Sequence, residues 1–294
     1  MYMKNKFIMT LKFFIILTIV SITLGREILI SDNIHKGKAM EIKSTSIGDS
    51  GTEEVSTRLE GAGTEESPYL IKSAADMRYM RNVINDGISE GSPGVINGTE
   101  AKTEAISAYY KLVNSIDLGK NWKAICLWKN FTEVKGNDMF SGHLDGNHKK
   151  IRFSSEEEGL FGIIGRDATI EDLTVNATIA NDNSERNDIS VFYIGIIAGG
   201  IYGTECKILG CRIEGSIQIN GCKYSETNIP QFGFSVGGVV GLNNGLIKDT
   251  ECLVSINCSK IFNARGGVGG IIGYNYQRGQ LINCNYEHKE EEEM

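Results

Sequence analysis

Four segments of the chain share one pattern of apolar and glycine positions. In each, a short apolar stretch is interrupted by glycine, closes on a glycine and leads into a run of alternating apolar and polar residues, as in a half-buried strand. A unit this short cannot bury its own apolar face, so the units must stack on one another. The four closing glycines are Gly165, Gly199, Gly241 and Gly273, which lie 34, 42 and 32 positions apart.

The alternating runs after these glycines predict which side chains face inward. Equivalent positions of stacked rungs lie about 4.8 Å apart, and crossovers between parallel strands are right-handed. The pattern therefore predicts an all-β fold, a right-handed parallel β-helix (solenoid). We expect the closing glycines at its corners, where a left-handed backbone excludes a Cβ. The two expected inward ladders are Leu173, Cys211, Thr250 and Cys284, and Val175, Ile213, Cys252 and Tyr286.

A helix is expected before the repeats, from Ala74 to Asn85. Ser73 followed by Asp76 is an N-cap pattern that starts such a helix. An open β-helix exposes unpaired backbone groups at its ends, so we expect an N-terminal capping helix. The apolar face that would cover the end of the coil contains Met77, Met80 and Ile84.

The first 25 residues have the composition of a signal peptide. Three lysines precede the uncharged apolar run Phe13 to Leu24. A membrane span needs about 20 residues, although an uncleaved anchor remains the alternative. We expect an extracellular or cell-surface protein with no transmembrane span after cleavage. The expected divisions are a signal peptide (1–25), a disordered linker (26–60), an N-terminal cap with the first β-helix segments (61–150), repeats (151–286) and an acidic tail (287–294).

Composition excludes one class of partner and argues against a disulfide framework. The net charge of −7 becomes −10 without the three N-terminal lysines, so nucleic acid is not expected to bind. Seven cysteines is an odd number for an exported chain. Cys211 and Cys284, two rungs apart, should be separated by about 9–10 Å, beyond the limit of about 7 Å for a disulfide.

Catalytic and metal-binding patterns are weak. The zinc-peptidase string His-Glu-x-x-His does not occur. His143 and His148 flank Asp145 and could hold a metal, but in a turn such residues are more typical of a solvated surface. Three acids, Asp167, Glu171 and Asp172, are the candidates for a polysaccharide-active enzyme, because paired carboxylates can act as acid and base. No aligned rung repeats them, so we expect no catalytic residue, metal or cofactor.

Three insertions of variable length separate a strand from the next apolar-glycine segment: residues 181–193, 220–235 and 259–267. Equivalent positions of a coil stack, so these loops should form one surface for recognition. Their aromatic and basic side chains suit stacking on a glycan or anchoring a host or matrix protein. Phe192, Tyr193 and Phe234 either join this surface or fold back into the core. The expected binding residues are Tyr224, Phe232, Phe262, Arg186, Lys223, Lys260 and Arg265.

The repeats and their lead-in resemble bacterial surface proteins with the GLUG motif, which Gly159-Leu160-Phe161-Gly162 matches literally. Residues 63–76, 111–118 and 140–151 resemble segments that precede the repeats in that family. Where the family has Gly-His after an Asn, this chain has His148-Lys149, which puts the tight turn there in question. The resemblance implies a secreted or displayed β-helix, in a family whose repeats also occur beside immunoglobulin-cleaving metallopeptidase domains.

These observations predict a secreted or cell-surface, non-enzymatic β-helix module for adhesion or ligand presentation. Two alternatives stay open: a polysaccharide-active β-helix enzyme, either a lyase or a hydrolase, and a purely structural stalk of a larger surface assembly. Carboxylates and aromatic rings that converge in a groove would favour the enzyme, whereas plain polar outer faces would favour the stalk.

Overall fold

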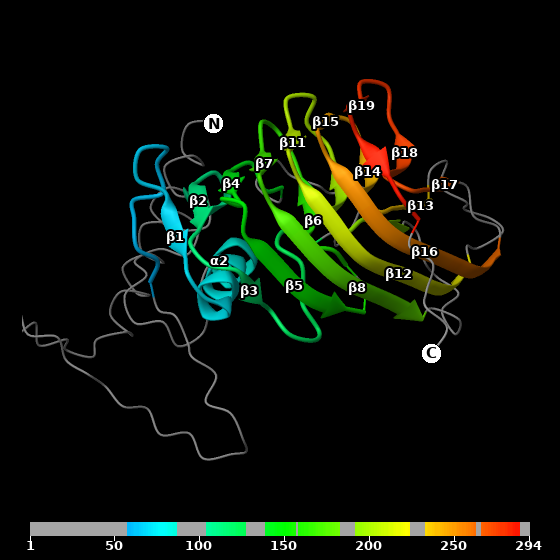
Figure 1. Ribbon diagram of the computed structural model, residues 1–294, viewed down its shortest axis with the longest axis horizontal. Coiled ribbons are helices and arrows are strands. Elements are labelled where there is room, and N and C mark those ends of the chain that lie inside the picture. The colour runs from blue at the N-terminus through cyan, green and yellow to red at the C-terminus, as the bar shows by residue number, and fades with distance from the viewer. Residues whose placement is uncertain are drawn as a thin grey trace, which may run out of the picture. The chain divides into compact units, whose positions relative to one another are not determined.

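The protein is a parallel β-helix (Figure 1). The computed structural model describes residues 58–86, 104–127, 139–156, 158–182, 192–223, 233–262 and 266–288. The expected signal peptide and most of the expected linker lie outside these residues. All pairings between the named strands are parallel, and they join the strands of successive turns into four sheets.

Each sheet is an ordered stack of strands from successive turns. The seven-stranded sheet contains, in spatial order, β1 (Tyr69–Ile71), β2 (Tyr109–Leu112), β4 (His143–Asp145), β7 (Thr169–Glu171), β11 (Lys207–Leu209), β15 (Leu246–Lys248) and β19 (Gln280–Ile282). The six-stranded sheet contains β20 (Asn285–Tyr286), β16 (Glu251–Phe262), β12 (Arg212–Lys223), β8 (Thr174–Asp182), β5 (Lys150–Ser155) and β3 (Ile116–Asp117). The four-stranded sheet contains β18 (Ile272–Asn275), β14 (Val240–Asn243), β10 (Ala198–Ile201) and β6 (Phe161–Ile164), and the three-stranded sheet contains β17 (Gly266–Gly269), β13 (Phe234–Gly237) and β9 (Phe192–Ile194).

The predicted inward ladders are confirmed by the strand register. Val175 pairs with Ile213, which pairs with Cys252, which pairs with Tyr286. The first three are fully buried. The other predicted ladder consists of the residues directly before these strands, Leu173, Cys211, Thr250 and Cys284. It is aligned as well, because Arg212 pairs with both Thr174 and Glu251, so the residues that precede them lie side by side.

The corner between the seven-stranded and six-stranded sheets is made by left-handed residues. Asp172, Gly210, Asp249 and Asn283 occupy equivalent positions of four turns and have φ of 48°, 59°, 50° and 50°. Asp and Asn tolerate this conformation better than other side chains. The amide of Asn283 donates to the carboxylate of Asp249, which links two of these corners.

The expectation that the closing glycines sit at left-handed corners was wrong. None of the four has a positive φ; Gly199, Gly241 and Gly273 lie within strands. A Cβ on Gly241 would lie 2.7 Å from the carbonyl oxygens of Gly199 and Ser235. One on Gly199 would lie 2.8 Å from the carbonyl oxygen of Tyr193. Glycine is therefore required because the three-stranded and four-stranded sheets approach each other closely.

The turn that departs from the family pattern keeps a left-handed backbone without glycine. Asn147 has φ 48° and His148 has φ 55°. The backbone NH of His148 donates to the carbonyl of Asp172 (2.8 Å), and the Asn147 side chain donates to the carbonyl of Leu112 (3.0 Å). His148 thus adopts a conformation that glycine would adopt without strain.

Helix α2 (Ala74–Asp86) ends one residue beyond the expected range. Its N-cap forms as predicted: Asp76 Oδ2 accepts from the Ser73 NH (3.0 Å), and Ser73 Oγ accepts from the Asp76 NH (3.3 Å). The expected apolar face, Met77, Met80 and Ile84, is buried in the same core as the inward ladders. Figure 1 shows α2 beside the first strands of the coil.

The described residues include the last three of the expected linker, residues 58–60. Leu59 is buried, and Glu60 forms an antiparallel bridge with Leu70. Glu60 also accepts from Lys72 Nζ (2.5 Å). Residues 58–60 therefore pack with the first strand of the coil.

Candidate functional site

The three insertions that were expected to carry recognition begin at one edge of the coil. Their strands β8, β12 and β16 are adjacent and in register, with Asn220 pairing with Asp182 and Lys223 pairing with Phe262. The strands that follow them, β9, β13 and β17, are also adjacent and in register. The starting points and end points of the three insertions therefore stack, as the sequence predicted. The expected bounds were too wide, because residues 220–223 belong to β12 and residues 259–262 to β16.

Most of the expected binding residues lie outside the described part of the chain. Lys260 lies on β16, is exposed and has φ 54°. Lys223 and Phe262 end β12 and β16 as register partners, and their side chains are not described. The residues outside the described ranges are Arg186, Tyr224, Phe232 and Arg265.

The aromatic residues nearest each glycine segment differ in their surroundings. Phe234 is 4% exposed and belongs to the core. Tyr193 is half-buried, and burial, aided by the nearby Tyr274 phenol, raises the pKa of Tyr193 to about 12. The side chain of Phe192 is not described. Phe234 therefore folds back into the core, whereas Tyr193 does so only in part.

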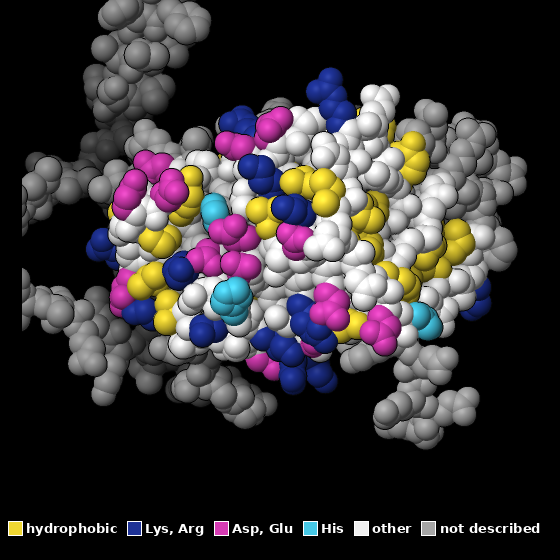
Figure 2. All heavy atoms as spheres, turned by 45° about the horizontal axis from the view of Figure 1, so that its top comes forward, with side chains coloured by type: hydrophobic (Ala, Val, Ile, Leu, Met, Phe, Trp, Pro, Cys, Tyr) yellow, Lys and Arg dark blue, Asp and Glu magenta, His cyan; other side chains and the backbone are white. Residues whose placement is uncertain are grey.

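A polar cluster lies on the outer face of the seven-stranded sheet. The rings of Tyr109 and His143 stack with centroids 5.2 Å apart, and His143 Nε2 lies 2.8 Å from Glu171 Oε1. Beside them, Lys111 Nζ donates to Asp145 Oδ2 (2.6 Å). Figure 2 shows acidic, basic and histidine side chains interspersed on this face. The sequence did not predict the cluster, because it joins residues 28 and 34 positions apart.

The three candidate catalytic acids have separate surroundings. Glu171 pairs with His143, whereas Asp172 forms the left-handed corner and Asp167 is exposed in the preceding turn. Asp145 and Glu171 are register partners on adjacent strands, so this is the pair of carboxylates that the fold brings together. Each has a basic partner, which is the ordinary state of a charge ladder on a sheet surface.

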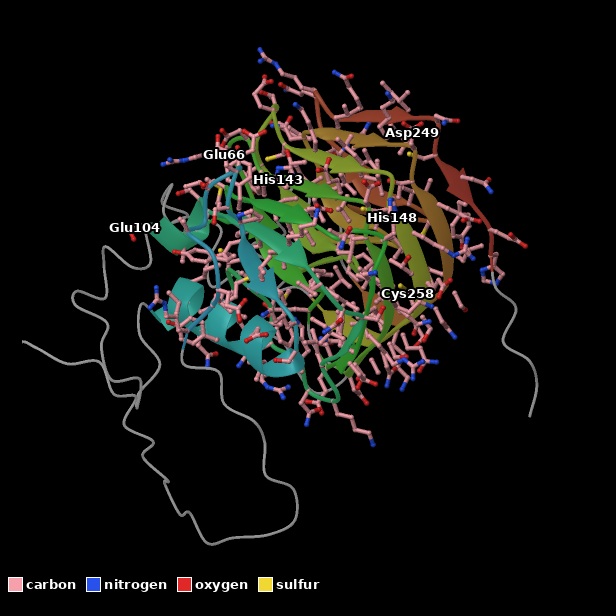
Figure 3. The ribbon with its side chains drawn as sticks, turned by 60° about the vertical axis from the view of Figure 1, so that its left-hand side comes forward. Glu66, Glu104, His143, His148, Asp249 and Cys258 are labelled. Carbon is pink, nitrogen blue, oxygen red and sulfur yellow. The ribbon has the colours of Figure 1, made fainter. Side chains whose placement is uncertain are left out.

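The histidine pair considered for a metal is not brought together. His143 lies on β4 and His148 in the corner turn, and Figure 3 labels the two well apart. Within the described ranges, no group of three or more His, Cys, Asp or Glu side chains could hold a metal ion.

Glu214, on β12 of the six-stranded sheet, accepts hydrogen bonds from three side chains. It accepts from Arg212 Nε (2.8 Å), Lys150 Nζ (3.0 Å) and Asn176 Nδ2 (3.3 Å). Burial opposes its ionisation, but these hydrogen bonds outweigh that effect and lower the pKa of Glu214 to about 2. The three donors come from strands β12, β5 and β8, so the carboxylate ties three rungs together.

Tyrosines form a further cluster near the three-stranded and four-stranded sheets. The rings of Tyr274 and Tyr276 lie 6.4 Å apart at 50°. Burial raises the pKa of Tyr202, with smaller contributions from Tyr193 and Tyr276. No sequence pattern indicated this cluster, because its members come from two turns of the coil that are not adjacent.

Side chains are described for six of the seven cysteines; none of these six forms a disulfide, and four of them are buried. Cys211 and Cys284 are both free, which confirms the prediction. Burial raises the pKa of Cys211 and of Cys252 to about 12 and that of Cys206 to about 11. Because the thiolate is the reactive form, these thiols are poor nucleophiles at neutral pH.

No known family profile matches the chain, and no solved structure matches it significantly. One similar protein is a Gly-rich membrane protein of Evansella cellulosilytica, named as putative, which is 27% identical over 128 residues. The match covers 39% of this chain and spans 12% of the length of that relative. Among the described residues, no helix is both long and apolar enough to cross a bilayer.

Proposed function

We propose that this chain is a secreted or cell-surface, non-enzymatic β-helix module that presents loops for adhesion or ligand binding. The observation that carries the proposal is the stacking of the insertions: three loops start from adjacent strands and return to adjacent strands. A rigid scaffold that displays adjacent loops is a common basis of recognition. The signal-like N-terminus and the name of the Evansella relative support a location at or beyond the membrane.

The ligand that we propose is a glycan or a host or matrix protein. The insertions contain tyrosine and arginine, which are enriched among the residues that anchor interfaces, and phenylalanine, whose ring can stack on flat ligands; lysines lie beside them. We infer from the family resemblance that the repeats are of the GLUG type, which occurs in displayed bacterial proteins.

The test is binding of the purified protein to arrays of glycans and matrix proteins. Saturable binding to one class, retained after the array is washed at high salt, is the expected result. If no surface binds while the protein remains folded by circular dichroism, the stalk alternative is favoured.

A polysaccharide-active enzyme is the second candidate, favoured by one observation. Asp145 and Glu171 occupy register positions on adjacent strands of an outer sheet face, beside the Tyr109 and His143 rings. Incubation with acidic and neutral polysaccharides tests it, with release of unsaturated or reducing ends as the readout. Release that disappears in Glu171→Gln would replace the non-enzymatic proposal.

A further inference from the structure

The outer face of the six-stranded sheet changes character along its three long strands. β8, β12 and β16 lie side by side in Figure 1 and lead into the three insertions. Ile179, Ile217 and Ile219 are buried and face inward, so the residues next to them face outward. We call two in-register rows of these outward residues the polar strip: Thr178, Ser216 and Ser255, and Ala180, Gln218 and Asn257.

Four side chains of the polar strip are unpaired. Among the described residues, the hydroxyls of Thr178, Ser216 and Ser255 and the amide of Asn257 have no hydrogen-bond partner. Thr178 and Asn257 are exposed, and the two serines are half-buried. Their donors and acceptors are therefore available to a ligand.

The first outward rows of the same strands differ, because their side chains bind one another. Glu214 accepts from Arg212 and Lys150, and Arg212 also pairs with Glu251. These charged groups are already occupied. The polar strip, by contrast, contains no charged residue and leaves most of its polar side chains unpaired.

The polar strip lies on the flank of the coil. β12 is paired on both sides, with β8 and with β16, and β16 is paired in turn with β20. Any further rung would pair at the edge of the sheet and lengthen the coil along its axis. The outer face of β8, β12 and β16 is therefore exposed wherever the coil ends.

We propose that the polar strip binds a neutral polysaccharide, which lies across β8, β12 and β16 and reaches the insertions. Equivalent groups recur about every 4.8 Å from rung to rung, so a chain of repeated sugars can meet similar groups at each rung. Sugar hydroxyls donate and accept hydrogen bonds, as the hydroxyls and amides of the polar strip also do. This inference rests on the proposed function, because it names the class of ligand for the same recognition surface.

The charge of this surface disfavours an acidic polysaccharide. No lysine or arginine belongs to the polar strip, and the net charge of −7 repels a polyanion. The charges beyond its far end, Asp182 on β8 and Lys260 on β16, are of opposite sign and so select neither an acidic nor a basic ligand. A protein partner is disfavoured as well, because the polar strip has no tyrosine, tryptophan or arginine to serve as an anchor.

Affinity electrophoresis of the purified full chain tests this inference. The native gels would contain hydroxyethyl cellulose or dextran, which are neutral, or alginate, which is acidic. We expect retardation by a neutral polysaccharide only. One variant combines Thr178→Val, Ser216→Ala and Ser255→Ala, and a second combines Gln218→Ala and Asn257→Ala at exposed positions that tolerate substitution. Each should raise the dissociation constant by about tenfold or more, because the losses of several hydrogen bonds multiply.

Thr174→Val is the matched control, because Thr174 faces outward on β8 two rows before the polar strip. It should keep the dissociation constant of the wild type, and circular dichroism should show that all three variants are folded. Two results would overturn this inference and leave the proposed function intact: neutral-polysaccharide binding that both strip variants keep, or binding only to alginate or to a matrix protein. Absence of binding to any of these ligands would overturn both.

Discussion

At the scale of single residues, backbone conformation decides which side chains the coil accepts. Asp172 looked like a catalytic acid because it adjoins Glu171, yet its place in the structure follows from a left-handed corner shared with Gly210, Asp249 and Asn283. Such a role is visible in the sequence only after the turns are aligned, when Asp, Gly, Asp and Asn fall at one position.

Replacing His148 by glycine should stabilise the protein. His148 has φ 55°, a conformation that costs a side chain about 1–2 kcal/mol and glycine little. Glycine is also more flexible in the unfolded state, so the expected net gain is about 0.5–1 kcal/mol. Urea unfolding measures this change in the free energy of unfolding. Lys149→Gly is the control: its φ is not positive, so it should lose stability, and a loss in both variants would refute the strain argument.

Gly241→Ala should cost more than Gly119→Ala. A Cβ on Gly241 would lie 2.7 Å from two backbone carbonyl oxygens, whereas a Cβ on Gly119 meets nothing within 4 Å and is disfavoured only by φ 75°. We expect a loss of about 2–3 kcal/mol or misfolding for Gly241→Ala and about 1 kcal/mol for Gly119→Ala. Thermal unfolding compares them; equal losses would mean that close sheet approach is not what requires glycine.

At the scale of elements, local patterns were the most predictable. The helix was expected from Ala74 to Asn85 and runs from Ala74 to Asp86, because its N-cap and apolar face are encoded within a few residues. The alternating run after each closing glycine was expected to be one strand, but a left-handed corner divides it into two strands of different sheets, such as β7 and β8. The glycines themselves were misinterpreted, because their contacts are with the neighbouring sheet and not with the chain beside them.

Met80→Lys tests whether α2 covers the end of the coil. Met80 is 1% exposed, so an unpaired ammonium there should destabilise the helix and uncover the first strands. We expect aggregation, measured by light scattering, before global unfolding. Arg78→Lys keeps the charge on a half-buried position of the same helix and should remain monomeric. Soluble, fully stable Met80→Lys protein would exclude the capping role.

The hydrogen bonds that Glu214 accepts should make the stability of the protein depend on pH. The pKa of Glu214 is lowered to about 2, below its unfolded value of about 4.3. Its contribution is therefore present at neutral pH and is lost as pH falls from about 4 towards 2. Glu214→Gln should cost about 1 kcal/mol at pH 7, allowing for solvent screening. The free energies of unfolding of the wild type and of Glu214→Gln, measured across this pH range, should become equal at low pH. A difference that stays constant with pH would contradict the assignment.

At the scale of the whole molecule, repetition made the architecture predictable, whereas the outer surface depends on the register. The parallel coil follows from four glycine segments and their alternating runs. The stacked Tyr109–His143 pair, its contact with Glu171 and the tyrosine cluster all depend on how many residues each turn contains. Variable insertions break a fixed period, so those neighbours could not be aligned beforehand.

The stacked insertions carry the central claim, and one variant tests it most directly. Residues 183–191, 224–232 and 263–265 would be replaced by short Gly-Ser turns, and Lys223, Lys260 and Phe262 by alanine. These changes keep the backbone of β8, β12 and β16 and of their partners. Binding to the glycan or matrix protein found for the wild type should be lost, while circular dichroism and the melting temperature stay near wild type. Unchanged binding by this loop-less protein would contradict the account and move recognition to the outer faces of the sheets.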